Sequence, residues 1–198
     1  MTFTPETKLV SAALRESIVE SRTVITLDTG MSGTGIAVWS DQRIYELEPP
    51  LAVGNVYPTK LQSKPLYSAN DSWWFRAASV MGHLTRWLTM WNPVLVVAEF
   101  PEFFQSSARG HAATTEGDTF KMAYFAGCIG NWCEVSGVEY KLITPREWKG
   151  QTSKETIERR IRVRLSDERW AGWDAALSAH AVDAVGMGLW LKGYLHNE

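Results

Sequence analysis

Four ionisable side chains lie beside apolar segments, where an unpaired charge is costly. Asp28 and Glu99 each close a short apolar run, and His180 and Asp183 are three residues apart in a helical pattern. A spacing of three places two side chains on one helix face. If the two run ends and this face meet, the carboxylates repel one another. Mg²⁺ or Mn²⁺, which prefer oxygen ligands, would relieve that repulsion, so the four residues are a candidate metal site.

Each of these residues alone also has a structural explanation. Asp28 precedes Thr29-Gly30 and could cap a turn, and His180 could be a hydrogen-bonded core histidine. The hypothesis of a metal site therefore depends on the set of four and on the elements that bring them together.

Short apolar strands and longer amphipathic helices alternate along the chain. We expect strands at 23–27, 35–39, 43–47, 94–98 and 139–143, and helices at 5–20, 73–91, 118–135, about 152–165 and about 173–195. The last but one helix would open on a Thr152-Ser153-Lys154-Glu155 capping box. Four prolines make 49–70 an irregular excursion, which contains Tyr57 and is long enough to suggest a functional loop.

The composition is that of one globular domain. The chain has 198 residues, 45% of them hydrophobic and 21% charged, which excludes a mostly disordered protein. No run approaches the roughly 20 apolar residues that span a bilayer, so we expect a cytoplasmic protein without a membrane partner. Cys128 and Cys133 are five residues apart, which places them on different faces of the expected helix and argues against a disulfide.

Positive charge is concentrated in one segment. Residues 141–169 hold nine of the 20 Lys and Arg but only five of the 22 Asp and Glu, so this segment carries +4 and the rest of the chain −6. Such a stripe suggests contact with a polyanion such as nucleic acid. An ordinary solvated helix face is the alternative.

Four segments, in order, resemble RuvC-type Holliday junction resolvases over about residues 23–192. The first two similar segments are Leu27-Asp28-Thr29-Gly30 with Thr34-Gly35, and Val96-Val97-Ala98-Glu99. The third is the expected strand at 139–143 followed by Pro145, Lys149 and Lys154, and the fourth is His180-Ala181-Val182-Asp183. The resemblance implies an α/β, RNase H-like fold with a mixed five-stranded sheet flanked by helices. The helical extension at 1–22 and the insertion at 49–70 are more similar to a bacteriophage-type variant than to the compact bacterial enzymes.

The resemblance also implies a metal-dependent endonuclease that resolves four-way or branched DNA. Asp28, Glu99, His180 and Asp183 would hold two Mg²⁺ or Mn²⁺ ions, although many bacterial relatives have Asp where this chain has His180. Lys149 and Lys154 would neutralise a phosphate. Candidate DNA-binding residues are a base-stacking aromatic among Phe100, Phe103 and Phe104, together with Arg146, Arg159, Arg160, Arg162, Lys60 and Lys64.

A four-way junction is two-fold symmetric and needs two symmetric cuts, which favours a homodimer. The helix that carries Trp73, Trp74, Phe75 and Trp87 could supply part of the interface, and core packing is the alternative for each of these side chains.

Three other functions remain open. The Asp28–Gly35 segment is also similar to the phosphate loop of actin-like kinases and ATPases, but those need two such lobes and a longer chain. A DNA-binding protein without turnover, or a nuclease for flaps or RNA–DNA hybrids, could share the fold. Metal-dependent cutting separates an enzyme from a binder.

Overall fold

The computed structural model describes residues 22–41, 49–59, 72–100, 117–165 and 178–195. Five strands form one mixed sheet in the order β3-β2-β1-β4-β5. The strands are β1 (Thr23–Asp28), β2 (Thr34–Ser40), β3 (Ala52–Val56), β4 (Leu95–Glu99) and β5 (Glu139–Ile143). The pairs β1–β2 and β2–β3 are antiparallel, and the pairs β1–β4 and β4–β5 are parallel. This is the mixed five-stranded sheet that the sequence predicted.

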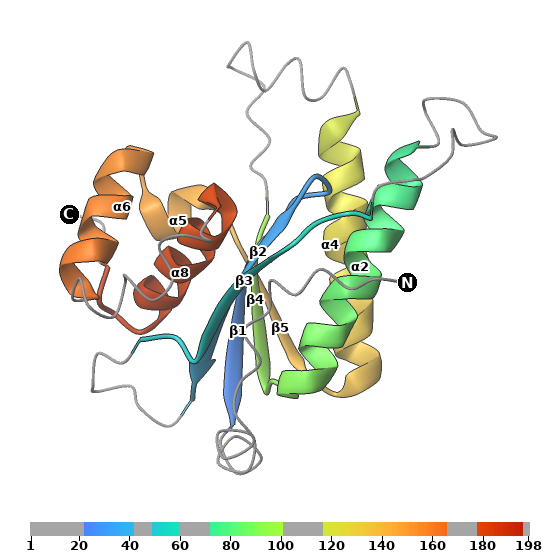
Figure 1. Ribbon diagram of the computed structural model, residues 1–198, viewed down its shortest axis with the longest axis horizontal. Coiled ribbons are helices and arrows are strands. Elements are labelled where there is room, and N and C mark those ends of the chain that lie inside the picture. Colours follow the sequence, from blue (N-terminus) through green and yellow to red (C-terminus); the bar gives the residue numbers. More distant parts are fainter. Residues whose placement is uncertain (1–21, 42–48, 60–71, 101–116, 166–177, 196–198) are drawn as a thin grey trace.

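Helices cover both faces of the sheet (Figure 1). On one face lie α2 (Ser72–Trp91) and α4 (Asp118–Ser136), and on the other lie α5 (Pro145–Lys149), α6 (Lys154–Arg164) and α8 (Ala179–Leu191). A separate hydrophobic core fills each interface. Every residue of the central strand β1 is buried, as expected for a strand that is covered on both sides.

The period of two along each strand decides which face a side chain meets. Ile25 and Leu27 of β1 belong to the core under α2 and α4, whereas Val24 belongs to the core under α8. On β4, Val97 also faces α8. Asp28 and Glu99, which continue this alternation, are therefore on the α8 side of the sheet.

Helix α8 lies close to the sheet because small residues line the contact. A Cβ added to Gly35 of β2 would lie 2.0 Å from the carbonyl oxygen of His180, and one added to Gly188 would lie 2.0 Å from the Trp39 ring. The hydroxyl of Thr26 donates to the Ala184 carbonyl at 2.7 Å. These contacts place the first turn of α8 over the ends of β1 and β2.

One strand differs from the sequence predictions, and two predicted elements cannot be compared with the structure. Residues 52–56, which we assigned to the irregular excursion, form β3 and pair with β2. Their alternation is weak, because all but Val56 are only partly buried in this edge strand. The predicted strand at 43–47 and the predicted helix at 5–20 lie outside the described residues.

The helix ends also differ locally. Ser153, not Thr152, caps α6, and its side chain accepts from the Thr156 amide. The capping box lies instead at Thr144 and Glu147, at the start of α5, a short helix that the sequence analysis did not predict. Helix α8 begins after its cap Ser178 and ends at Leu191, so it is shorter than expected.

Two further expectations concern membranes and cysteines. In the part of the chain that the structure describes, no helix combines the length and apolar character needed to cross a bilayer. Cys128 and Cys133 are both free thiols, as their spacing predicted.

We expect Gly35→Ala to destabilise the protein, because its methyl group would collide with the backbone of α8. Overpacking of this kind costs about 1–3 kcal/mol. The control is Gly82→Ala in α2, where a Cβ would meet no atom within 4 Å and the helix should gain up to about 1 kcal/mol. Urea unfolding measures both, and equal stability of the two variants would contradict the close contact.

Candidate active site

Two carboxylates end neighbouring parallel strands. Leu27 of β1 pairs with Ala98 of β4, so the residues that follow, Asp28 and Glu99, lie side by side at the carboxyl edge of the sheet. The Thr29 hydroxyl donates to the Glu99 carbonyl at 2.7 Å and ties the two strand ends together. In open α/β sheets this edge is where ligands usually bind.

Helix α8 adds an imidazole and a third carboxylate. His180 Nδ1 lies 2.7 Å from Asp28 Oδ2, and since a carboxylate only accepts, the imidazole N–H is the donor. The α8 cap holds this turn in place, because the Ser178 hydroxyl accepts from the Ala181 amide and is hydrogen-bonded to Asn55 of β3. His180 is therefore fixed against Asp28 by both its backbone and its ring.

The ammonium group of Lys149 lies between two of the acids. Its Nζ is 3.7 Å from Glu99 Oε2 and 3.8 Å from Asp183 Oδ2. Lys149 is the last residue of α5, and only about a quarter of its side chain is exposed. One protein cation thus offsets part of the charge of both carboxylates.

Trp148 is a site residue to which the sequence analysis assigned no role. Its indole Nε1–H donates to Glu99 Oε2 at 2.6 Å, and the ring is fully buried. The ring packs on α8, where a Cβ on Gly186 would lie 2.7 Å from it. Its position next to Lys149, a candidate catalytic residue, was the one sign in the sequence that Trp148 could belong to the site. Its hydrogen-bond partner Glu99 is 49 residues away in the sequence.

Burial and the charge of neighbouring carboxylates raise the pKa values of Glu99 and Asp183. Burial, followed by the charge of Asp28, raises the pKa of Glu99 to about 7, although Lys149 and the Trp148 hydrogen bond act against the shift. Burial also raises the pKa of Asp183, and Lys149 opposes this. The pKa of His180 is raised, chiefly by its hydrogen bond to Asp28. The carboxylates of Asp28, Glu99 and Asp183 therefore concentrate negative charge at this edge of the sheet, and a bound cation would stabilise that charge.

The donor set suits a hard divalent cation, since it consists of three carboxylates and an imidazole. Among the residues that the structure describes, no group of three His, Cys, Asp or Glu side chains already stands in an arrangement that could hold an ion. The ammonium of Lys149 lies between Glu99 and Asp183 instead. Asp28, Glu99, His180 and Asp183 remain the residues that could bind a metal ion.

The predicted basic residues lie on α5 and α6, on the α8 side of the sheet (Figure 1). Lys154, the first residue of α6, is exposed, and its charge is close enough to Asp183 to oppose the rise in the pKa of that carboxyl. Arg146 and Arg159 are exposed, and Arg160 is partly buried. Arg162 pairs with Glu158 at 3.0 Å. A basic surface therefore adjoins the acid cluster.

The other predicted DNA-binding residues are only partly described. Phe100 is half-buried beyond the end of β4, and its amide donates to the Ile143 carbonyl at 2.8 Å. Phe103, Phe104, Lys60 and Lys64 lie outside the described residues.

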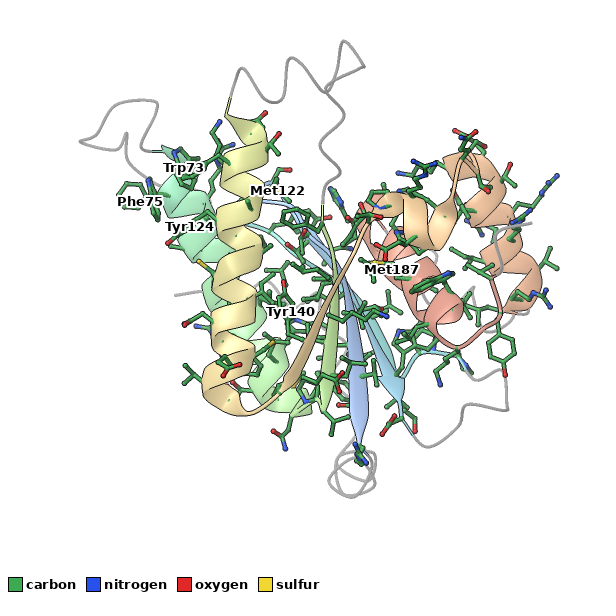
Figure 2. The ribbon with its side chains drawn as sticks, turned by 180° about the vertical axis from the view of Figure 1, so that it is seen from behind. Trp73, Phe75, Met122, Tyr124, Tyr140 and Met187 are labelled. Atoms are coloured by element: carbon green, nitrogen blue, oxygen red, sulfur yellow. The ribbon has the colours of Figure 1, made fainter. Side chains whose placement is uncertain are left out.

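Exposed aromatic side chains gather on the opposite face of the molecule. Trp73 and Trp74 stack with ring centroids 4.4 Å apart, and Tyr124 of α4 packs on Trp74 at 4.4 Å. Figure 2 shows Trp73, Phe75 and Tyr124 together at one end of α2 and α4. Trp87 instead packs on β3, where a Cβ on Gly54 would meet its ring at 2.7 Å.

A groove of about 600 Å³ runs between α2 and α4. Its lining includes Met81, Tyr124, Cys128, Trp132 and Val135, and it is mostly apolar. Val135 is 81% exposed, so this face leaves apolar surface uncovered.

The fold is that of known Holliday junction resolvases. Thermus thermophilus RuvC in complex with a Holliday junction substrate aligns with a TM-score of 0.58 and 19% identity over 85% of this chain and 91% of that one. The fowlpox virus Holliday junction resolvase aligns with a TM-score of 0.52 and 15% identity over 88% of this chain and 99% of that one. The RuvC-like RNase H fold that the sequence motifs suggested is confirmed. No family model matches the sequence, and no curated protein matches it.

The raised pKa of Glu99 predicts a pH-dependent stability difference. A raised pKa means that Glu99 favours folding while protonated, below pH 4.5, and that this contribution is lost as the pH rises through about 7. Glu99→Gln, which stays neutral and keeps an acceptor for Trp148, should therefore match the wild type near pH 4.5. It should be more stable above pH 7 by up to about 3 kcal/mol in EDTA.

Urea unfolding at several pH values measures this difference, with Glu147→Gln as the control. Hydrogen bonds from Thr144 lower the pKa of Glu147, so Glu147 stabilises the fold above its unfolded pKa and the control should be less stable than wild type at neutral pH. A difference between Glu99→Gln and wild type that stays constant from pH 5 to 8 would refute the shift at Glu99.

Proposed function

We propose that this chain, which has the fold of RuvC-type Holliday junction resolvases, is a metal-dependent endonuclease that cuts four-way or branched DNA. One observation carries the proposal. Asp28, Glu99 and Asp183 come from two strand ends and a helix, and they meet in one half-buried corner with Lys149. Clustered acids at a sheet edge, with raised pKa values at Glu99 and Asp183, are typical of a functional site.

Asp28, Glu99 and Asp183 would hold two Mg²⁺ or Mn²⁺ ions, with His180 completing the set. When bound, these ions would supply an activated water and neutralise charge on the phosphoryl oxygens and the leaving 3′-oxygen. His180 orients Asp28 through the 2.7 Å hydrogen bond. Trp148 orients the Glu99 carboxylate through its 2.6 Å hydrogen bond to Oε2.

The surrounding cations would bind the DNA backbone. Lys149 and Lys154 flank the acids, so each could neutralise the phosphate that is cut or its neighbour. Arg146 and Arg159 are exposed on α5 and α6 and could bind phosphates farther along the strand. Contacts of this type release counterions, so affinity should fall as salt rises.

We further propose that the protein acts as a homodimer through α2 and α4. A two-fold symmetric junction calls for two active sites related by the same symmetry. The aromatic cluster of Trp73, Trp74 and Tyr124 and the adjoining groove leave apolar surface exposed on the face opposite the acids. Two copies packed on this face would both keep their acid clusters open.

The main test is Asp28→Asn, which keeps the shape of the side chain and an acceptor for His180. The variant should bind a four-way junction in EDTA as tightly as the wild type, melt no lower, and cut at least about 10²-fold more slowly in Mg²⁺. Cleavage of a labelled junction, a flap and an RNA–DNA hybrid measures the rate and identifies the substrate.

The control for this test is Asp41→Asn. Asp41 pairs with Arg22 at the opposite end of the sheet, so its loss should leave cleavage unchanged. If Asp28→Asn cuts near the wild-type rate under saturating Mg²⁺, Asp28 is structural and the nuclease proposal fails.

Val135→Glu tests the dimer, since Val135 lines the α2–α4 groove. A carboxylate there should shift the protein toward the monomer in sedimentation equilibrium. Val163→Glu is the matched control, because Val163 is 78% exposed, against 81% for Val135, and lies in the last turn of α6 on the other face. The same oligomeric state for both variants and the wild type would reject this interface.

A further inference from the structure

Tyr57 is an exposed aromatic at the same edge of the sheet as the acids. It directly follows β3, whose last residue, Val56, pairs with Thr34 at the start of β2. In the next register position of β2, Gly35 pairs with Asp28. Tyr57 therefore leaves the sheet beside the acid cluster, and it remains 53% exposed.

The ring of Tyr57 rests on the turn that connects β1 to β2. A Cβ on Gly33 would lie 2.9 Å from Tyr57 Cε1 and 3.0 Å from Cδ1, so only glycine lets the ring approach this closely. Gly30 belongs to the same turn, and a Cβ there would lie 2.5 Å from the Gly33 carbonyl oxygen and 3.6 Å from His180 Cε1. His180 is in turn hydrogen-bonded to Asp28. The ring is thus linked to the acid cluster through one short turn.

Hydrogen bonds to α2 hold the chain just after Tyr57. The Thr59 amide donates to Ser79 Oγ at 2.8 Å, and the Ser79 hydroxyl donates to Thr59 Oγ1 at 3.1 Å. Thr59 Oγ1 also lies 3.1 Å from His83 Nε2. With the turn on one side and α2 on the other, Tyr57 is a pre-positioned side chain, so it would lose little entropy on binding a ligand.

We propose that Tyr57 stacks on a nucleobase of the DNA strand whose phosphate enters the acid cluster. This inference rests on the proposed nuclease function and adds a specific contact to it. Along a DNA strand a base accompanies every phosphate. A phosphate bound beside the acids, by Lys149 and by metal ions when these are present, would therefore bring bases to the rim where Tyr57 lies. An aromatic ring can stack on any of the four bases. Such a contact suits a protein that recognises the shape of branched DNA and not its sequence.

Binding and fluorescence measurements on two substitutions test this proposal. Tyr57→Phe keeps the ring, and Tyr57→Leu keeps apolar volume without it. In EDTA, Tyr57→Leu should bind a four-way junction about tenfold or more weakly, since stacking by one aromatic contributes this much, whereas Tyr57→Phe should bind within about twofold of wild type. In a junction with 2-aminopurine near the crossover, wild type and Tyr57→Phe should change the fluorescence equally, and Tyr57→Leu should change it less.

Met90→Leu is the matched control, because Met90 is 54% exposed and lies at the end of α2 that adjoins the start of β1. It should bind the junction as the wild type does. Unchanged melting temperatures of all three variants would show that a loss of affinity is an effect on DNA binding. If Tyr57→Leu alone melts lower, its affinity and fluorescence are compared with those of the other proteins at a temperature at which all of them are folded.

Two results overturn the inference. One is equal junction affinity of Tyr57→Leu and wild type, and the other is a loss of affinity and of the 2-aminopurine signal in Tyr57→Phe as large as in Tyr57→Leu. A different result would contradict the proposed nuclease function. In that case the wild type would not cut DNA when metal ions are present, although its binding to the junction would still depend on the ring of Tyr57.

Discussion

Three carboxylates share one half-buried corner, and offsetting their repulsion is the constraint on which the remaining contacts depend. In the metal-free chain the offset comes from protein groups. His180 donates to Asp28, and Lys149 lies between Glu99 and Asp183. These partners do not cancel the effect of burial and mutual repulsion, because the pKa of Glu99 still rises to about 7. The corner is therefore arranged to receive additional positive charge.

Close packing of α8 on the sheet creates this corner. Gly35 allows the backbone of β2 to meet the backbone of α8 at His180, and Thr26 donates to the Ala184 carbonyl one turn later. Alternation along β1 and β4 then directs the two strand-end acids to the side that α8 covers.

The two faces of the molecule differ in chemistry. The acid cluster and its neighbouring basic residues lie on the side of α5, α6 and α8, whereas the exposed cluster of Trp73, Trp74 and Tyr124 and the apolar groove lie on the side of α2 and α4. Separating the faces by the sheet allows one surface to contact a polyanion while the other contacts a protein. The basic segment 141–169, which stood out in the sequence, supplies part of the first surface.

The sequence by itself determined the positions of Asp28 and Glu99 at strand ends and the placement of His180 and Asp183 three residues apart on one helix, because these follow from short-range hydrophobic periodicity. It missed the edge strand β3, whose partly buried residues lack clear alternation. Only the tertiary structure decided that Trp148 binds Glu99 and that Lys149 lies between two acids. Such contacts join residues tens of positions apart, and their geometry depends on how α5 and α8 pack on the sheet, which no local pattern encodes.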